Sequence, residues 1–168
     1  MVRVNSRVAG KKNYTPLIAG IMAICAIVDQ AAKALVLANL EPGVIYQVIG
    51  TWFKFRLVFN PGAAFGMGES STWLFSTLQL LFVVGTLIAA RYIRAPWTAV
   101  GLALIGGGAL GNLIDRLVRA PGFWFGHVVD YISVGSFAIF NIADACINVG
   151  VVVFIIGIMT QEDKEATA

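Results

Sequence analysis

The sequence predicts an all-α membrane protein with four transmembrane helices and a small β-sheet at the outer membrane surface. Of its 168 residues, 58% are hydrophobic and 12% are charged, and the mean hydropathy is +0.82. Soluble domains instead carry roughly a quarter of charged residues. A bilayer span needs about 20 apolar residues, so four spans nearly fill the chain. We therefore expect a single integral membrane domain covering residues 1–168.

Long apolar runs with few charges mark the spans. The expected spans are residues 16–40, 72–90, 95–116 and 139–161, joined on the outer side by loops at residues 41–71 and 117–138. The first span also carries Asp29 and Lys33, which lie four positions apart and can therefore pair on one helical face. Basic residues before this span fit a signal peptide, but no small-residue cleavage site precedes Glu41, so we expect the span to be retained.

The distribution of basic residues predicts the orientation. If the spans alternate, one side of the membrane receives Arg3, Arg7, Lys11, Lys12, Arg91, Arg94 and Lys164. The positive-inside rule places this side, with both termini, in the cytoplasm. Arg116 and Arg119 break the pattern because they follow the third span on the outer side, beside Asp115. We expect structure or function, rather than topology, to hold that basic pair.

The two outer loops carry strand-like sequence. From Thr51 to Phe59, apolar and basic side chains alternate with period two, which is typical of an amphipathic strand. The turn residues Pro61 and Gly62 follow, so we expect a small sheet on the outer surface with its aromatic side chains toward lipid. A second strand is expected at residues 127–132.

Two aspartates, Asp130 and Asp144, lie in otherwise apolar sequence. Asp130 falls in the second outer loop and Asp144 at the outer end of the fourth span, so the two can meet in space. A charge at the bilayer centre costs about 2.5–3.5 kcal/mol on insertion scales, and even a shallow acid therefore favours a functional interpretation. Position alone also allows each aspartate to be a solvated or helix-capping residue.

Other polar side chains gather at the same end of the spans. Asn141, Asp144 and Asn148 follow i, i+3, i+7 spacing on the fourth helix, and Asn112 and Arg116 are four positions apart on the third. Such stripes usually face the bundle interior, where they can simply join helices. That explanation suffices for Asn148, but it accounts less well for a convergence of five polar groups.

Two adjacent carboxylates support acid–base hydrolysis because they cannot both ionise easily, so one retains a proton. The ionised carboxylate acts as a base on a shared water, and the protonated one polarises a carbonyl. A single histidine, His127, and the lack of an H-E-x-x-H motif disfavour a zinc protease. Ser133 and Ser136 lack the G-x-S-x-G pattern, so a serine nucleophile stays open without support.

Two further features are expected to serve packing. Cys25 and Cys146 lie in separate apolar spans without metal-ligand spacing, and we expect them to be small core residues. The run of glycines at residues 106–108 lacks the Lys-Ser/Thr of a phosphate loop and lies within a span, where close helix packing explains it.

Five motifs occur in order across nearly the whole chain: Asp29-Gln30 with Lys33, Phe59 to Gly66, Gly111 to Arg116, Val128 to Tyr131, and Phe140 to Asp144. With these motifs the sequence resembles the family of lipoprotein signal peptidase, or signal peptidase II, a bacterial aspartyl protease. The resemblance implies four transmembrane helices with a small extracytoplasmic β-cradle. It also implies that Asp130 and Asp144 form the catalytic dyad.

The resemblance implies supporting residues as well. The positions expected to line or support the site are Asn60, Asn112, Arg116, Asn141, Asp29 and Lys33. Asp115 matches a position that supports the fold, through pairing with Arg119. No metal or organic cofactor is implied. Tyr131 replaces the commoner phenylalanine, and the short spacer between the two dyad positions leaves the shape of the second outer loop open.

The implied activity is an intramembrane or interfacial endopeptidase that removes the signal peptide from diacylglyceryl-modified prolipoproteins, cutting before the lipidated cysteine. The implied partners are that substrate and membrane lipids, with no nucleic acid. The implied location is the bacterial cytoplasmic membrane, with the active site on the extracytoplasmic side. A four-helix transporter is the main alternative, although its ion site would usually lie near the midplane. A non-catalytic assembly protein would instead tolerate asparagine at both dyad positions.

Overall fold

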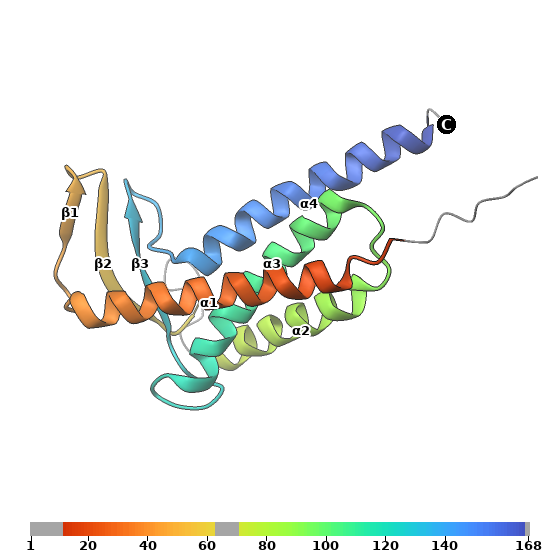
Figure 1. Ribbon diagram of the computed structural model, residues 1–168. Helices are drawn as coiled ribbons and strands as arrows, with labels where there is room; N and C mark the ends of the chain where they lie inside the picture. Colours follow the sequence, from red (N-terminus) through yellow and green to blue (C-terminus); the bar gives the residue numbers. More distant parts are fainter. Residues whose placement is uncertain (1–11, 63–70, 167–168) are drawn as a thin grey trace, which may run out of the picture.

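The computed structural model describes residues 12–62 and 71–166 (Figure 1). The helices are α1 (Thr15–Asn39), α2 (Thr72–Ala90), α3 (Pro96–Val118) and α4 (Ile142–Ala166), and the strands are β1 (Tyr46–Ile49), β2 (Phe53–Asn60) and β3 (Val128–Val134). All four of these helices are long and apolar enough to cross a membrane. The predicted fold class is confirmed, with the sheet at one end of the bundle, hereafter the sheet end. Arg3, Arg7, Lys11 and residues 63–66 of the second motif lie outside the described residues.

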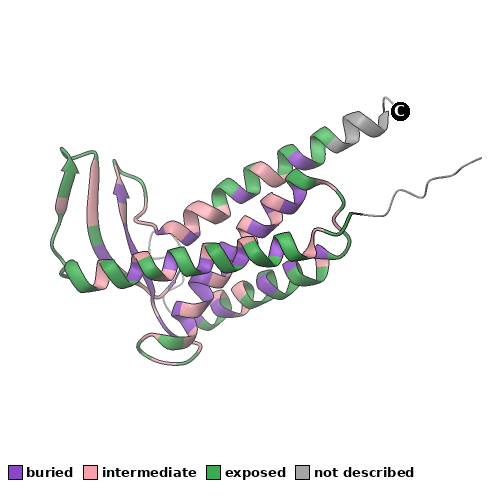
Figure 2. Ribbon diagram, viewed as in Figure 1, coloured by how far each residue is buried: buried purple, intermediate pink, exposed green. Residues whose placement is uncertain are grey.

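The α3 helix forms the centre of the bundle because it packs against each of the other three helices. Figure 2 shows buried positions concentrated on α3 and exposed positions along the outward sides of α1, α2 and α4. Successive helical residues point about 100° apart. A Cβ atom placed at Gly106, Gly107 or Gly108 would accordingly collide with α2, α1 or α4, respectively. The expected packing role of this glycine run is confirmed.

The α1 helix buries a single stripe that changes from apolar to charged along its length. The buried positions are Ile18, Met22, Ala26, Asp29 and Lys33, at helical spacings of three and four. The first part of the stripe belongs to the hydrophobic core of the bundle. Asp29 and Lys33 pair at 2.7 Å with both side chains fully buried, as their spacing predicts.

The sheet is antiparallel, in the order β1-β2-β3, and packs on one end of α1. Leu57, Val129 and Tyr131 form its small core, and Phe55 packs against them, so the expectation that the aromatic side chains of β2 face lipid is wrong for Phe55. The pairing register of β2 with β3 shifts after Phe55. This irregularity breaks the period-two alternation and leaves Phe59 exposed.

The structure differs from the sequence-based expectation at β3, β1 and the start of α4. The β3 strand confirms the strand expected at residues 127–132 and extends it to Val134. The β1 strand is unpredicted, although the β-branched residues before Tyr46 favour a strand. The α4 helix begins at Ile142 rather than at residue 139, because Phe140 exchanges backbone hydrogen bonds with Ile132 beside the sheet.

Replacing Gly108 with alanine should destabilise the bundle and displace the start of α4. The added Cβ would fall on the carbonyl oxygen of Ala143 and 2.7 Å from Cγ1 of Ile147. A backbone atom cannot move aside as a flexible side chain can, so we expect the Tm in detergent to fall by roughly 3–10 °C. Gly20→Ala is the matched control, because a Cβ there meets nothing within 4 Å. Equal Tm values for the two variants would contradict this packing.

Candidate active site

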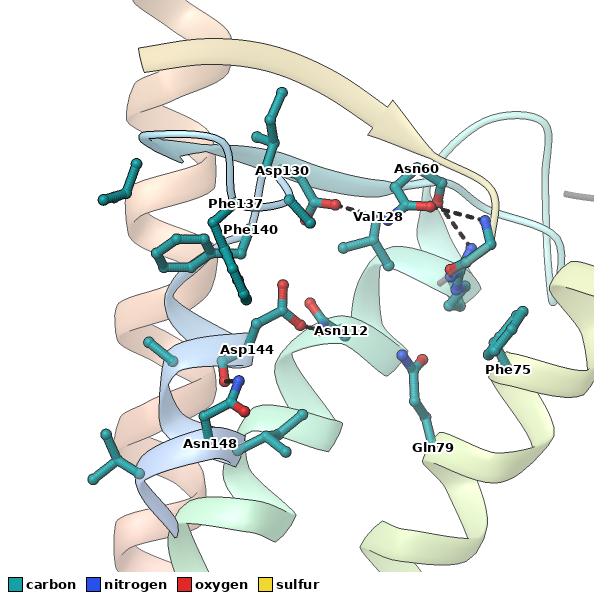
Figure 3. Close-up of a pocket in the computed structure, with 18 residues that line it drawn as sticks. Asn60, Phe75, Gln79, Asn112, Val128, Asp130, Phe137, Phe140, Asp144 and Asn148 are labelled. Atoms are coloured by element: carbon teal, nitrogen blue, oxygen red, sulfur yellow. Dashed lines mark hydrogen bonds between the residues drawn. The ribbon is translucent and has the colours of Figure 1, made fainter. Parts of the chain in front are cut away.

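Asp130 and Asp144 line one cavity at the sheet end of the bundle. Asp130 belongs to β3 and Asp144 to the first turn of α4, and the cavity has a volume of about 830 Å³. The Asp130 side chain is almost fully buried. Figure 3 shows both aspartates in the wall of this cavity, below the sheet. Two acids from separate elements therefore share one cavity.

Capping hydrogen bonds hold Asp144 at the start of α4. The Asn141 Oδ1 atom accepts from the backbone N–H of Asp144 at 2.9 Å, and the backbone N–H of Asn141 donates to Asp144 Oδ2 at 3.2 Å. This reciprocal pair is a capping box, with aspartate in place of the usual glutamate. Asn141 is thus the N-cap rather than a residue within the helix. The cap fixes the direction of the Asp144 carboxylate without removing it from the cavity.

Amide side chains connect the two carboxylates. Asn112 Nδ2 donates to Asp144 Oδ1 at 2.8 Å, while Asn112 Oδ1 accepts from Asn141 Nδ2 at 3.1 Å. Asn141 Nδ2 also donates to Asp130 Oδ1 at 2.7 Å, and Asn60 Nδ2 donates to Asp130 Oδ2 at 2.8 Å. Each carboxylate oxygen therefore accepts at least one hydrogen bond, which orients both side chains.

Burial is the main reason that the pKa of Asp130 rises to about 7, and the negative charge of Asp144 raises it further. The hydrogen bonds from Asn60 and Asn141 oppose the rise because they favour the ionised form. A carboxyl group with this pKa gains or loses its proton near neutral pH. The cavity thus holds one carboxyl group suited to carrying a proton beside a second carboxylate.

Arg116 clamps the turn that carries Asn60. Its Nη1 donates to the carbonyl oxygens of Asn60, Pro61 and Gly126 at 3.1, 3.0 and 3.1 Å, and its Nη2 donates to that of Gly62 at 2.6 Å. Arg116 also lines the cavity, but no hydrogen bond joins it to either aspartate among the described residues. Its guanidinium therefore positions the turn and adds positive charge near the carboxylates without binding them directly.

Asp29 and Lys33 lie behind the cavity rather than in its wall. Lys33 Nζ sits 2.7 Å from Asp29 Oδ2 and 2.8 Å from Asp115 Oδ2, and all three side chains are fully buried. We call Asp29, Lys33 and Asp115 the buried ion cluster. Lys33 Nζ also donates to Asn112 Oδ1 at 2.9 Å. Because Asn112 Oδ1 accepts from Lys33, the amide of Asn112 is oriented with its Nδ2 atom toward Asp144.

The buried ion cluster also holds backbone next to each aspartate of the cavity. Asp29 Oδ1 accepts from the N–H of Ala143 at 3.0 Å, one of the N–H groups left without a helical partner at the start of α4. Asp115 Oδ2 accepts from the N–H of Val129 at 3.0 Å. The cluster therefore fixes both the helix start and the strand that carry the acids.

Gln30 is a supporting residue to which the sequence analysis assigns no role. Its Nε2 donates to Gly111 O at 2.9 Å and to Asp115 Oδ1 at 3.0 Å. Its position beside Asp29 in the first motif was the only signal for it. The expected pair of Asp115 with Arg119 is present, with Arg119 Nε 2.6 Å from Asp115 Oδ1.

The alternative hydrolytic groups do not line the cavity. Ser133, Ser136 and His127 are absent from the described residues of its wall. Within residues 12–62 and 71–166, no group of three or more His, Cys, Asp or Glu side chains could hold a metal ion. Among the described residues, the acidic side chains that line the cavity are Asp130 and Asp144.

Comparison with known proteins agrees with the resemblance. Residues 21–160 match the family described as Signal peptidase (SPase) II. The Lipoprotein signal peptidase of Rhodococcus jostii is 47% identical over 128 residues, which cover 76% of this chain and 65% of that protein. The Lipoprotein signal peptidase of Streptomyces griseus is 41% identical over 159 residues, 94% of this chain and 80% of that protein. A solved bacterial membrane enzyme superimposes with a TM-score of 0.79 and 27% identity, over 92% of this chain and 94% of that one.

Asp115→Asn should lower stability more than activity. The change removes one of the two carboxylates that pair with the fully buried Lys33, which keeps Asp29, so the cost should stay below the about 3–5 kcal/mol of an unpaired buried charge. Asp115 does not line the cavity. We expect a lower yield and a lower Tm in detergent, with the activity per folded molecule largely kept. Asp130→Asn is the comparison variant, and it should keep its Tm and lose activity. A stable but inactive Asp115→Asn protein would mean that Asp115 takes part in the chemistry.

Proposed function

The chain belongs to the signal peptidase II family, and we propose that it is an aspartic endopeptidase in which Asp130 and Asp144 activate one water molecule. The family makes the chain a peptidase with membrane-spanning helices, and the relatives carry the name lipoprotein signal peptidase. The substrate would be a prolipoprotein inserted in the membrane and modified with diacylglyceryl on a cysteine. The bond cut would be the peptide bond just before that cysteine.

The joint hydrogen bonding of two carboxylates in one cavity carries this proposal. Asn141 Nδ2 donates to Asp130 Oδ1 and to Asn112 Oδ1. Asn112 Nδ2 in turn donates to Asp144 Oδ1, so the two asparagines connect the two carboxylates. An aspartic dyad needs one ionised and one protonated carboxyl group at the working pH. The pKa of about 7 for Asp130, caused first by burial and then by Asp144, supports such a singly protonated pair.

In the proposed reaction, the ionised carboxylate takes a proton from water as the water oxygen attacks the scissile carbonyl carbon. The protonated carboxyl group donates to the carbonyl oxygen and stabilises the negative charge that develops there. The carbon–nitrogen bond then breaks, the leaving amine takes the proton first removed from water, and the former carbonyl oxygen returns its proton to the carboxylate that gave it. The products are a signal peptide with a new carboxylate and a lipoprotein with a free amine on its lipidated cysteine.

The walls of the cavity suit an apolar peptide that arrives from the membrane. They are contributed by α2, α3, α4 and the sheet end, and they include Phe75, Ile139 and Ile147. The α2 and α4 helices pack mainly on α3 rather than on each other. A signal peptide could therefore approach between α2 and α4, while its lipid group stays in the membrane. Asn60, Asn112 and Asn141 would hold the dyad, with Arg116 and the buried ion cluster supporting them.

We also propose that the sheet end faces the extracytoplasmic side of the bacterial cytoplasmic membrane, with both termini in the cytoplasm. The α2–α3 turn, which carries Arg91 and Arg94, lies at the opposite end of the bundle from the sheet (Figure 1). The positive-inside rule assigns such a basic turn to the cytoplasm.

Single cysteines at the two ends of the bundle should be labelled from opposite sides of the membrane. Arg94→Cys and Ser136→Cys are suitable because both positions are exposed, at the α2–α3 turn and the sheet end. With Cys25 and Cys146 replaced by serine, an impermeant maleimide added outside intact spheroplasts should label only the Ser136→Cys protein. Inverted vesicles should give the reverse. Labelling of both positions from one side would rule out the four-span topology.

Asp130→Asn, Asp144→Asn and the double variant should be almost equally inactive. Asparagine keeps the size of the side chain but removes the acid or the base, each of which contributes roughly 10²–10⁴-fold to the rate. Because groups that act as a unit lose activity non-additively, the double variant should be little worse than either single variant. Single-turnover cleavage of a diacylglyceryl-modified prolipoprotein at equal folded concentration measures this, with the cut bond identified by mass spectrometry. Glu41→Gln is the control, because it neutralises an exposed acid near the sheet end. Substantial cleavage by either single variant would argue against the dyad, as would losses that multiply.

The same pair sets the expected pH dependence of the parent protein. Below the lower pKa of the pair both carboxyl groups are protonated and the base is lost; above the higher pKa both are ionised and the acid is lost. With the pKa of Asp130 near 7, the rate should fall as the pH rises through about 7. A rate that stays constant well above that pH would contradict a singly protonated active pair.

A further inference from the structure

Two amide side chains line the cavity away from the dyad. Gln79 belongs to α2 and Asn148 to α4, and both are part of the cavity wall. Figure 3 shows them on opposite sides of the cavity and farther from the sheet than Asp144. Polar side chains within membrane spans usually join helices, and those that join no helices are candidates for binding a ligand. Gln79 and Asn148, hereafter the amide pair, should therefore contact either another helix or a ligand.

Gln79 has an unused hydrogen-bonding atom. Its Oε1 is buried, and no described residue donates to it. Asn148 Nδ2 donates to the backbone carbonyl of Asp144 at 2.8 Å, which is a bond within its own helix. The explanation that Asn148 joins helices is therefore wrong for the described structure. Within residues 12–62 and 71–166, no hydrogen bond from either amide joins two helices.

A peptide bond must leave the helical form before it can be cut, because a helix pairs and encloses its backbone groups. An extended segment exposes N–H and C=O groups, and the membrane interior offers no water to bind them. Amide side chains provide both a donor and an acceptor. Gln79 and Asn148 would thus match the backbone of an extended peptide without selecting its side chains.

We propose that Gln79 and Asn148 bind the backbone of the extended substrate segment on the N-terminal side of the scissile bond, from opposite walls of the cavity. This inference rests on the proposed function. A signal peptide would reach the dyad from the membrane, so the part of the substrate farther from the sheet end is the part before the cut. The amide pair lies on that path and would set which bond reaches Asp130 and Asp144.

Replacing the amides with leucine tests this role. The bound peptide uses the amides only once it is extended, so Gln79→Leu and Asn148→Leu should each lower kcat about five- to tenfold and change KM less than twofold. Thr77→Val is the matched control, because the Thr77 hydroxyl donates to Trp73 O within α2 and Thr77 is absent from the described residues of the cavity wall. It should keep the parental kcat. A fall in Tm that accompanies the fall in kcat would point to a structural role and overturn the inference.

Substrates with one backbone N–H replaced by an ester oxygen identify the contact. The ester is moved through successive positions before the scissile bond, and each substrate is cleaved by the parent protein and by Gln79→Leu. At one position the ester should slow the parent about five- to tenfold and leave the variant unaffected. Equal slowing of both proteins at every position, or parental kcat in both leucine variants, would overturn the inference. If the parent fails to cleave the unmodified prolipoprotein, the proposed function fails first.

Discussion

The candidate active site depends on the ion pairs that the buried Lys33 ammonium makes with Asp29 and Asp115. Charges removed from water must be paired, and loss of one partner strongly destabilises a buried pair. The two carboxylates of this cluster also accept the backbone N–H groups of Ala143 and Val129, at the start of α4 and in β3. Moving α1, α3, α4 or the sheet would therefore leave a buried charge or N–H group without its partner. Electrostatics, added to apolar packing, holds these elements in one arrangement.

The glycine-rich surface of α3 makes such a cluster sterically feasible. A Cβ at Gly111 would lie 2.8 Å from Asp29 Oδ2 and 3.2 Å from the Cβ of Ala143, so the missing side chain lets α1 and α4 approach α3 together. Thr86 of α2 lies similarly close to Gly106. Close packing and the short ionic contacts thus result from the same small helix–helix separations.

Neutral amides, rather than cations, are the direct neighbours of the two acids in the cavity. Asn60, Asn112 and Asn141 orient the carboxylates, whereas a guanidinium in direct contact would hold them ionised. The nearby Arg116 is instead bonded to four backbone carbonyl oxygens. This division of roles is consistent with a pKa near 7 for Asp130, in which burial outweighs the hydrogen bonds. A pair that shares one proton needs such a balance.

The sequence by itself determined the features that depend on residues close together in the chain. Apolar run length predicted the four helices, period-two alternation predicted β2, and the four-residue spacing of Asp29 and Lys33 predicted their pairing. Only the tertiary structure decided that Asn141 reaches Asp130 in β3, that Lys33 reaches Asn112, and that β2 changes its register after Phe55. These contacts join segments distant in the chain or break the local period. Their geometry follows from how α1, α3, α4 and the sheet pack together, which local periodicity does not encode.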